Sequence, residues 1–181
     1  MPFTFKQLNL SGVYLIDSKK FADFRGEFLE MFKASEFITA GMNVEFKQDN
    51  FSKSQKGVLR GLHFQLPPKA QGKLVRAVQG KIFDVAVDMR KSSPTFKQWL
   101  SVELSAENAL ALYVPPGFAH GFLSLTDDTL VLYKTTEEYA ADLERGVRWN
   151  DPELAIAWPL PKPLLAERDA KFPLLKDAEY V

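Results

Sequence analysis

The stretch Leu74-Val-Arg-Ala-Val-Gln-Gly-Lys-Ile-Phe-Asp-Val-Ala-Val-Asp88 indicates the class of fold. In its second half, apolar side chains at 83, 85 and 87 alternate with Asp84, Ala86 and Asp88. A period of two residues is typical of a β-strand, so the pattern predicts a strand over 81–88. Alternation alone leaves open whether the face with the two aspartates lines an interior or meets solvent.

The first half of the same stretch predicts a second strand over 74–78. Gln79-Gly80 between the two runs predicts a hairpin turn. Similar short patterns, separated by Gly, Pro, Asn and Asp, recur over most of the chain. They predict further strands at 12–16, 27–32, 44–50, 57–65, 98–104, 110–114, 121–125 and 130–135. Many short strands favour a mainly β protein, an antiparallel sandwich or barrel.

Two segments interrupt this pattern and predict short helices. Ser35 to Gly41 begins with a capping serine and ends with a glycine. Residues 164–171 lie between Pro163 and Pro173, which bound a short helix near the C-terminus. Because composition does not shift along the chain, we expect a single domain over 1–181.

Composition limits the function classes. The 181 residues carry 23 basic and 23 acidic side chains and a formal charge of zero. This balance offers no global attraction for nucleic acid or an anionic membrane. The N-terminus has no charged and apolar signal-peptide pattern, and no apolar run is long enough to span a bilayer. With no cysteine in the sequence, we expect a cytoplasmic protein without disulfides.

The chain has only two histidines, His63 and His120, and no thiol. These imidazoles are therefore almost the only side chains whose ordinary pKa suits proton transfer near neutral pH. A lone histidine is more often a buried, hydrogen-bonded core residue. Around His63, however, polar and basic residues crowd together, so a functional interpretation is equally supported. The neighbours are Arg60, Gln65, Lys69 and Lys73.

Other candidates are weaker when taken alone. Asp169 is by itself an ordinary charged residue of a solvated helix, and Tyr133 an ordinary strand aromatic. Arginines and lysines are scattered along the sequence and form a phosphate clamp only if the fold brings them together. The sequence has neither a P-loop nor a Gly-x-Gly-x-x-Gly motif, so nucleoside triphosphate hydrolysis and Rossmann-type dinucleotide binding are unsupported.

Pro115, Gly117 and His120 form a Pro-x-Gly-x-x-His pattern that resembles the second motif of the cupin superfamily of jelly-roll barrels. Metal-binding cupins supply several histidines and a glutamate from two such motifs. Here each region supplies one histidine, so the usual cupin metal site lacks ligands. The preferred interpretation is a cupin cavity used without a metal, and a weaker site of two histidines and a carboxylate is the alternative.

Taken together, nine segments resemble the dTDP-4-dehydrorhamnose 3,5-epimerase family. They run in order through almost the whole chain: 23–28, 48–50, 58–65, 71–76, 83–90, 92–95, 116–122, 133–134 and 149–152. The resemblance implies a cupin-type jelly-roll β-barrel with a few short helices, without metal or cofactor. It also implies a homodimer with exchanged N-terminal strands. The implied activity is that of an isomerase in dTDP-L-rhamnose biosynthesis, which inverts C3 and C5 of dTDP-4-dehydro-6-deoxy-D-glucose to give dTDP-4-dehydro-L-rhamnose.

By position, the resemblance also assigns four catalytic roles. They are His63 as the general base, Asp169 as the carboxylate that holds and polarises it, Lys73 as the cation that stabilises the enolate, and Tyr133 as the acid on the opposite face. A histidine beside a carboxylate is a suitable base near neutral pH. A preorganised cation at the C4 oxygen stabilises the developing charge by several kcal/mol.

The resemblance further implies a set of substrate-binding residues. Gln48, Asn50, Arg60 and His120 would contact the sugar or the diphosphate, Tyr139 and Glu144 would hold the thymidine end, and Arg25, Phe28 and Glu30 would reach into the partner's site. Two departures from the family pattern stand out. Arg168 occupies a position where lysine is frequent, which keeps the positive charge for a diphosphate but changes its geometry. The proline expected after Tyr139 is missing, which affects the fit of the thymine pocket.

Three alternatives remain open. A single-centre epimerase of another deoxysugar pathway would share the same side chains. A non-catalytic sugar-nucleotide-binding cupin would be expected to lack the base or the acid, and this sequence keeps both. A metal-dependent cupin is the third alternative.

Overall fold

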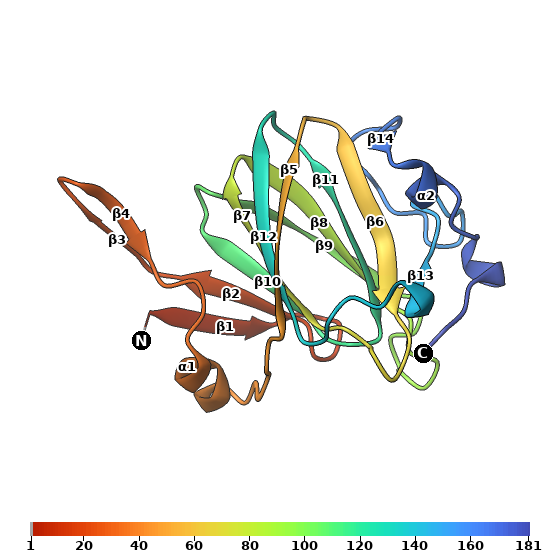
Figure 1. Cartoon of the computed structure of the whole chain (residues 1–181), viewed down its shortest axis with the longest axis horizontal. Helices are drawn as coiled ribbons and strands as arrows, with labels where there is room; N and C mark the ends of the chain where they lie inside the picture. The colour runs from red at the N-terminus through yellow and green to blue at the C-terminus, as the bar shows by residue number, and fades with distance from the viewer. Residues whose placement is uncertain (1) are drawn as a thin grey trace.

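A computed structural model describes residues 2–181 as two antiparallel sheets that face each other (Figure 1). The expected domain over 1–181 thus begins one residue outside the described range. The first sheet has the order β1-β2-β10-β7-β12-β5. Its strands are β1 (Phe3–Gln7), β2 (Tyr14–Ser18), β10 (Leu110–Val114), β7 (Lys73–Gln79), β12 (Thr129–Thr135) and β5 (Gln48–Ser54). The predicted mainly β architecture is confirmed.

The second sheet has the order β13-β6-β11-β8-β9, and the short β14 pairs in parallel with β6. Its strands are β13 (Glu144–Gly146), β6 (Val58–Gln65), β11 (Phe118–Ser124), β8 (Lys81–Asp88), β9 (Trp99–Ser105) and β14 (Leu164–Leu165). The strand predicted over 81–88 has the predicted bounds. Most other predicted strands are confirmed within a few residues, whereas β1, β3 (Lys20–Asp23), β13 and β14 were not predicted.

Three apolar clusters account for the packing. The first lies between the sheets, where Ile82 and Ala86 of β8 meet Val75 and Val131 of the opposite sheet. Asp84 and Asp88 share this inward face and are fully buried, which answers the question that alternation left open. Val85 and Val87 point the other way and pack against the C-terminal segment. A third cluster joins the N-terminal strands, α1 (Ala34–Thr39) and the outer face of the first sheet.

The hairpin predicted at Gln79-Gly80 is wrong. β7 pairs with β10 and β12, whereas β8 pairs with β9 and β11, so the two strands belong to different sheets. Gly80, with φ of +71°, turns the chain from one sheet into the other. A tight turn and a corner between sheets carry the same alternation on either side, so the local pattern does not distinguish them.

The helix predictions are only partly correct. α1 has Lys33 at its N-cap with no side-chain cap, so Ser35 lies inside the helix and is not the cap. Gly41, with φ of +83°, follows the helix end as predicted. Of residues 164–171, only Glu167–Ala170 form a helix, α2, because Leu164–Leu165 join β6 as β14. The remaining helical elements are single turns of 3₁₀-helix, η1 (Ala141–Leu143) and η2 (Leu175–Asp177).

A separate hairpin of β3 (Lys20–Asp23) and β4 (Gly26–Leu29) projects away from the two sheets (Figure 1). Its aromatic side chains are exposed, Phe24 to 98% and Phe28 to 64%. Within residues 2–181, no helix combines the length and the apolar character needed to cross a membrane.

Candidate active site

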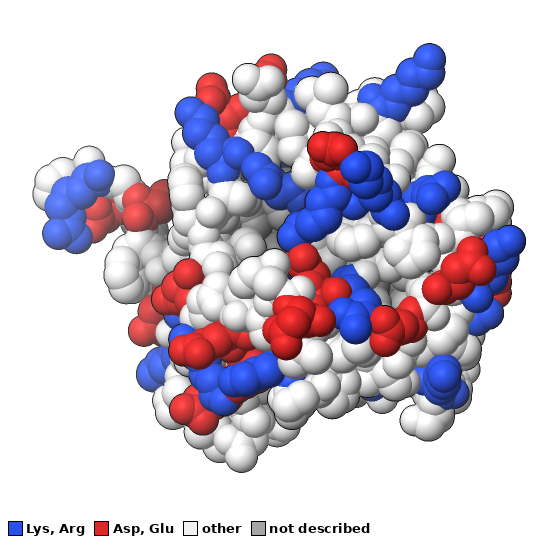
Figure 2. Space-filling model, turned by 45° about the vertical axis from the view of Figure 1, so that its right-hand side comes forward, with Lys and Arg blue, Asp and Glu red and all other residues white. Residues whose placement is uncertain are grey.

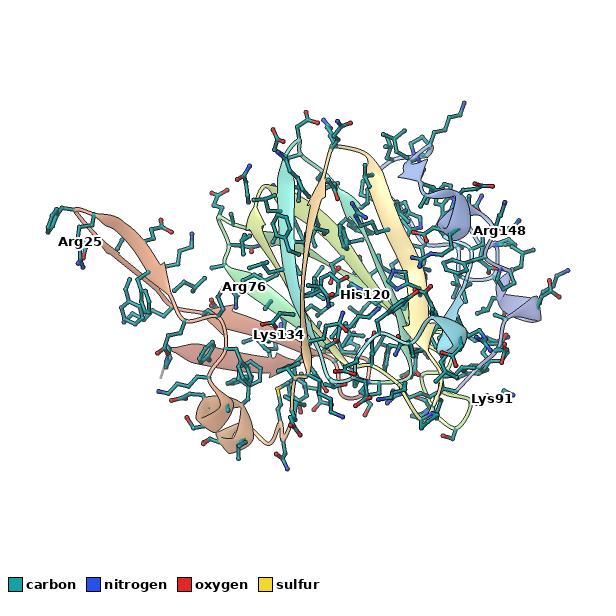
Figure 3. The ribbon with its side chains drawn as sticks, viewed as in Figure 1. Arg25, Arg76, Lys91, His120, Lys134 and Arg148 are labelled. Carbon is teal, nitrogen blue, oxygen red and sulfur yellow. The ribbon has the colours of Figure 1, made fainter. Side chains whose placement is uncertain are left out.

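A cavity of about 490 Å³ opens between the sheets beside α2. It brings together seven of the residues proposed from sequence: Arg60, His63, Lys73, His120, Tyr133, Arg168 and Asp169. Figure 3 shows His120 in the interior, between the strands of the two sheets. On the face shown in Figure 2, lysine and arginine side chains border a hollow. The strands therefore collect acid, base and cationic groups that are far apart in the sequence.

Arg60 and His63 both line this cavity although simple alternation places them on opposite faces of β6. The register pairs His120 with His63 and Phe122 with Arg60, so β6 carries one more residue than β11 between these pairs. Such a β-bulge changes the direction of the following side chains. Gly61 allows it: its φ is +113°, and a Cβ there would lie 2.6 Å from the Cα of Gly121. Simple alternation along β6 therefore fails between Arg60 and His63.

His63 lies beside a lysine in this cavity. Its Nδ1 lies 3.2 Å from Nζ of Lys73. Burial, followed by the charges of Lys73, His120 and Arg168, lowers the pKa of His63 well below its usual value of 6.5. The imidazole is consequently neutral at physiological pH, which is the form that can accept a proton.

Lys73 is a buried cation, only 4% exposed. Its Nζ also donates a hydrogen bond of 3.2 Å to the backbone oxygen of His63. Burial lowers the pKa of Lys73 from 10.5 to about 8, while the charges of Glu144 and Asp84 act in the opposite direction. Lys73 remains mostly protonated at neutral pH, so it can stabilise an anion formed next to His63.

Asp169 lies in the same cavity, but its hydrogen bonds differ from those expected. Oδ2 accepts the backbone N–H of Gly61 at 2.9 Å, and Oδ1 accepts Nε of Arg168 at 3.2 Å. His63 is not among its recorded partners in residues 2–181. The carboxylate thus fixes the backbone of β6 two residues before His63, rather than the imidazole itself.

His120 forms the only carboxylate–imidazole pair in the described part of the chain. Its Nε2 lies 2.8 Å from Oδ1 of Asp84, and both residues are buried. The sequence identified His120 as a substrate-binding candidate but gave Asp84 no role. The sequence did indicate that Asp84 lies on the same face of its strand as Ala86, but it did not show that this face points inward.

Tyr133 lies on the wall formed by the first sheet. Burial raises the pKa of its phenol, so the hydroxyl keeps its proton at neutral pH. A small adjoining cavity shares His63, Lys73 and Tyr133 with the large one and adds Gln48, Asn50 and Glu144. At its rim, Tyr139 Oη donates to Glu144 Oε2 at 3.3 Å, and Arg168 Nη1 donates to the same oxygen at 2.6 Å.

Three residues proposed from sequence lie away from this cavity. Arg25 is at the tip of the β3–β4 hairpin, where it pairs with Asp23 at 2.6 Å (Figure 3). Phe28 and Glu30 line a separate hollow at the base of the hairpin. In the described part of the chain, no three His, Asp or Glu side chains are grouped closely enough to hold a metal ion.

Fold and cavity together define a cupin-type barrel whose interior holds a histidine of lowered pKa beside a buried lysine. The sequence profile described as dTDP-4-dehydrorhamnose 3,5-epimerase matches residues 7–177. The chain belongs to this family of isomerases that act on carbohydrates.

Individual relatives agree with this assignment. The Shigella flexneri dTDP-4-dehydrorhamnose 3,5-epimerase is 53% identical over 172 residues, which cover 94% of this chain and 95% of the relative. A crystal structure of the Bacillus anthracis enzyme with TDP and PPi bound has a TM-score of 0.93 and 48% identity, and covers 96% of this chain and 99% of its own. The Legionella pneumophila 3,5-epimerase in complex with dTDP-4-keto-L-rhamnose has a TM-score of 0.92 and 44% identity, with 96% and 93% covered.

Proposed function

We propose that this chain inverts C3 and C5 of dTDP-4-dehydro-6-deoxy-D-glucose to give dTDP-4-dehydro-L-rhamnose, with His63 as the base. The observation that carries the proposal is the contact of 3.2 Å between His63 Nδ1 and the buried Lys73 ammonium, inside a cavity that also holds Tyr133. This arrangement pairs a neutral base with a cation and a protonated phenol.

The reaction follows from the substrate's C4 ketone. Its carbonyl acidifies the hydrogens at C3 and C5, because the carbanion formed at either carbon is delocalised as an enolate. His63 removes the proton, and Lys73 stabilises the negative charge on the C4 oxygen. Tyr133 returns a proton from the opposite face of the ring, which inverts the carbon. Asp169 supports the base through the backbone of Gly61.

The remaining cavity residues fit a nucleoside diphosphate sugar. Arg60 and Arg168 are exposed guanidiniums at the mouth of the cavity, suited to the diphosphate. Gln48, Asn50 and His120 lie deeper and can bind the sugar. Tyr139, whose exposed ring lies beside Glu144, would hold the thymidine end.

The proposal includes a homodimer in which the N-terminal strands cross to the partner. The projecting β3–β4 hairpin supports it, because a lone chain exposes Phe24 and Phe28 to water. In the dimer, Arg25, Phe28 and Glu30 would complete the partner's cavity.

Incubation with dTDP-4-dehydro-6-deoxy-D-glucose in deuterated water tests the proposal. Enzyme-dependent deuterium at both C3 and C5 is expected, together with the inverted product. Label at one carbon would indicate a single-centre epimerase, and no label would indicate a binding protein or another substrate. His63→Ala should abolish exchange while the circular dichroism spectrum stays unchanged, and near-parent activity would rule out His63 as the base.

A further inference from the structure

Asp84 is a buried charge to which the proposed mechanism assigns no role. It lies on the inward face of β8 and is fully buried. Oδ1 pairs with Nε2 of His120 at 2.8 Å, but Oδ2 is buried without a hydrogen-bond partner in the described part of the chain. A buried carboxylate with one unsatisfied oxygen destabilises the folded protein. Packing alone would be better served by an apolar side chain, so a functional reason is indicated.

The pairing with Asp84 determines which nitrogen of His120 is available to a ligand. Nε2 is committed to the carboxylate. Nδ1 forms no hydrogen bond within residues 2–181, and it is not fully buried. Because His120 lines the large cavity, Nδ1 is the ring atom open to that cavity. The register pairs His120 with His63, and both side chains line the same cavity.

We propose that Asp84 is a positioning residue that holds His120 as an imidazolium with Nδ1–H directed into the cavity, where it donates to the C4 oxyanion beside Lys73. This inference rests on the proposed function. With Nε2–H given to Asp84, Nδ1 carries a hydrogen only in the imidazolium, and the adjacent carboxylate compensates that charge. Two donors from different strands would then bind one oxyanion, as in other preorganised oxyanion sites.

The charges around the pair are compatible with this role. His63 of β6 is neutral at physiological pH, and Lys73 of β7 is the other buried cation. Arg60 and Arg168 lie at the cavity mouth, and Tyr133 faces the cavity from β12. The three anions Asp84, Asp169 and Glu144 offset three of the four positive charges that result once His120 is an imidazolium, which leaves one positive charge for the anionic diphosphate of the proposed substrate.

The test is Asp84→Asn, which keeps shape and hydrogen bonding but removes the charge. The matched control is Asp88→Asn: Asp88 is equally buried on the same face of β8, but it pairs with Arg90, Ser93 and Thr95 and does not line the cavity. Wild-type deuterium exchange is measured first. We expect Asp84→Asn to lower kcat by about 100-fold with KM changed by less than about threefold, as for a lost oxyanion donor. The control should keep kcat within about threefold.

Two further measurements separate positioning from folding. If Asp84 acts mainly through His120, Asp84→Asn should lower kcat much less in a His120→Asn background than in the wild type. Since the chain has only two histidines, ¹⁵N-histidine labelling gives two imidazoles to assign. Wild-type His120 should carry hydrogen on both nitrogens at pH 7, and in Asp84→Asn on one.

Additive losses, an unchanged imidazole spectrum, or kcat within threefold of wild type in Asp84→Asn would each overturn the role of Asp84. Absence of exchange in the wild-type protein would instead refute the proposed function itself.

Discussion

Lys73→Met should make the protein more stable while removing its activity. The structure supplies the magnitude. Burial lowers the pKa of Lys73 from 10.5 to about 8, and at about 1.4 kcal/mol per pH unit this corresponds to roughly 3 kcal/mol of unfolding free energy. Loss of the hydrogen bond from Nζ to the His63 oxygen destabilises the variant by about 1 kcal/mol. The expected net gain at pH 7 is therefore about 2 kcal/mol.

The gain has a definite pH dependence. Below pH 8 Lys73 is charged in both the folded and the unfolded protein, so the full desolvation cost is present. Between about 8 and 10.5 the unfolded chain binds more protons than the folded one, and wild-type stability rises with pH. The advantage of Lys73→Met should therefore shrink over this range and vanish above it.

Equilibrium urea unfolding followed by tryptophan fluorescence, at one fixed protein concentration, measures the difference. Lys81→Met is the matched control, because Lys81 is partly exposed and pairs with Glu103 across β8 and β9. It should change stability by less than about 0.5 kcal/mol. Activity of Lys73→Met should fall at least about 100-fold. A Lys73→Met protein less stable than wild type at pH 7 would refute the argument that Lys73 is buried at a cost for its charge.

Three other predictions follow from the site. The acid limb of kcat/KM should have its midpoint below pH 6.5, because the pKa of His63 is lowered. The alkaline limb should have its midpoint near pH 8, because Lys73 loses its charge there. An acid midpoint above 6.5 would contradict the assignment of His63. Gly61→Ala should destabilise the protein by at least about 2 kcal/mol more than Gly26→Ala in urea unfolding, since both have positive φ but only Gly61 faces backbone at 2.6 Å; equal losses would show that close packing is unimportant there. Tyr133→Phe should still incorporate deuterium by return to the original face while the inverted product, measured by NMR, falls about 100-fold or more; parent-level inversion would exclude Tyr133 as the acid.

Local patterns predicted the strands well, because alternation reports directly which side chains a pleated backbone places on each face. The strand at 81–88 is the clearest case. Local patterns failed where pairing between segments far apart in the sequence determines the structure. Gly80 joins two sheets rather than two paired strands, and Leu164–Leu165 leave their predicted helix for the edge of β6.

The candidate site likewise combines residues that the sequence predicted with contacts that it could not predict. The resemblance named seven residues that the cavity does bring together. The bulge at Gly61, however, depends on the close approach of Gly121 from another strand, and no feature of residues 58–65 alone signals it. Asp169 likewise accepts a backbone N–H of β6, a partner that a side-chain pattern cannot predict. The sequence left open whether Asp84 is buried or exposed, and only the fold shows that its face of β8 points inward.

The charge states of the cavity depend on one another, which explains why its buried ions occur together. The Lys73 charge is one cause of the lowered pKa of His63, so the cation that would bind the enolate also keeps the base free of a proton. Glu144 and Asp84 in turn act against the loss of the Lys73 proton. Removing one carboxylate should therefore lower the pKa of Lys73. Loss of the Lys73 charge should in turn let the pKa of His63 rise. A mechanism that needs a neutral imidazole 3.2 Å from an ammonium therefore requires these anions.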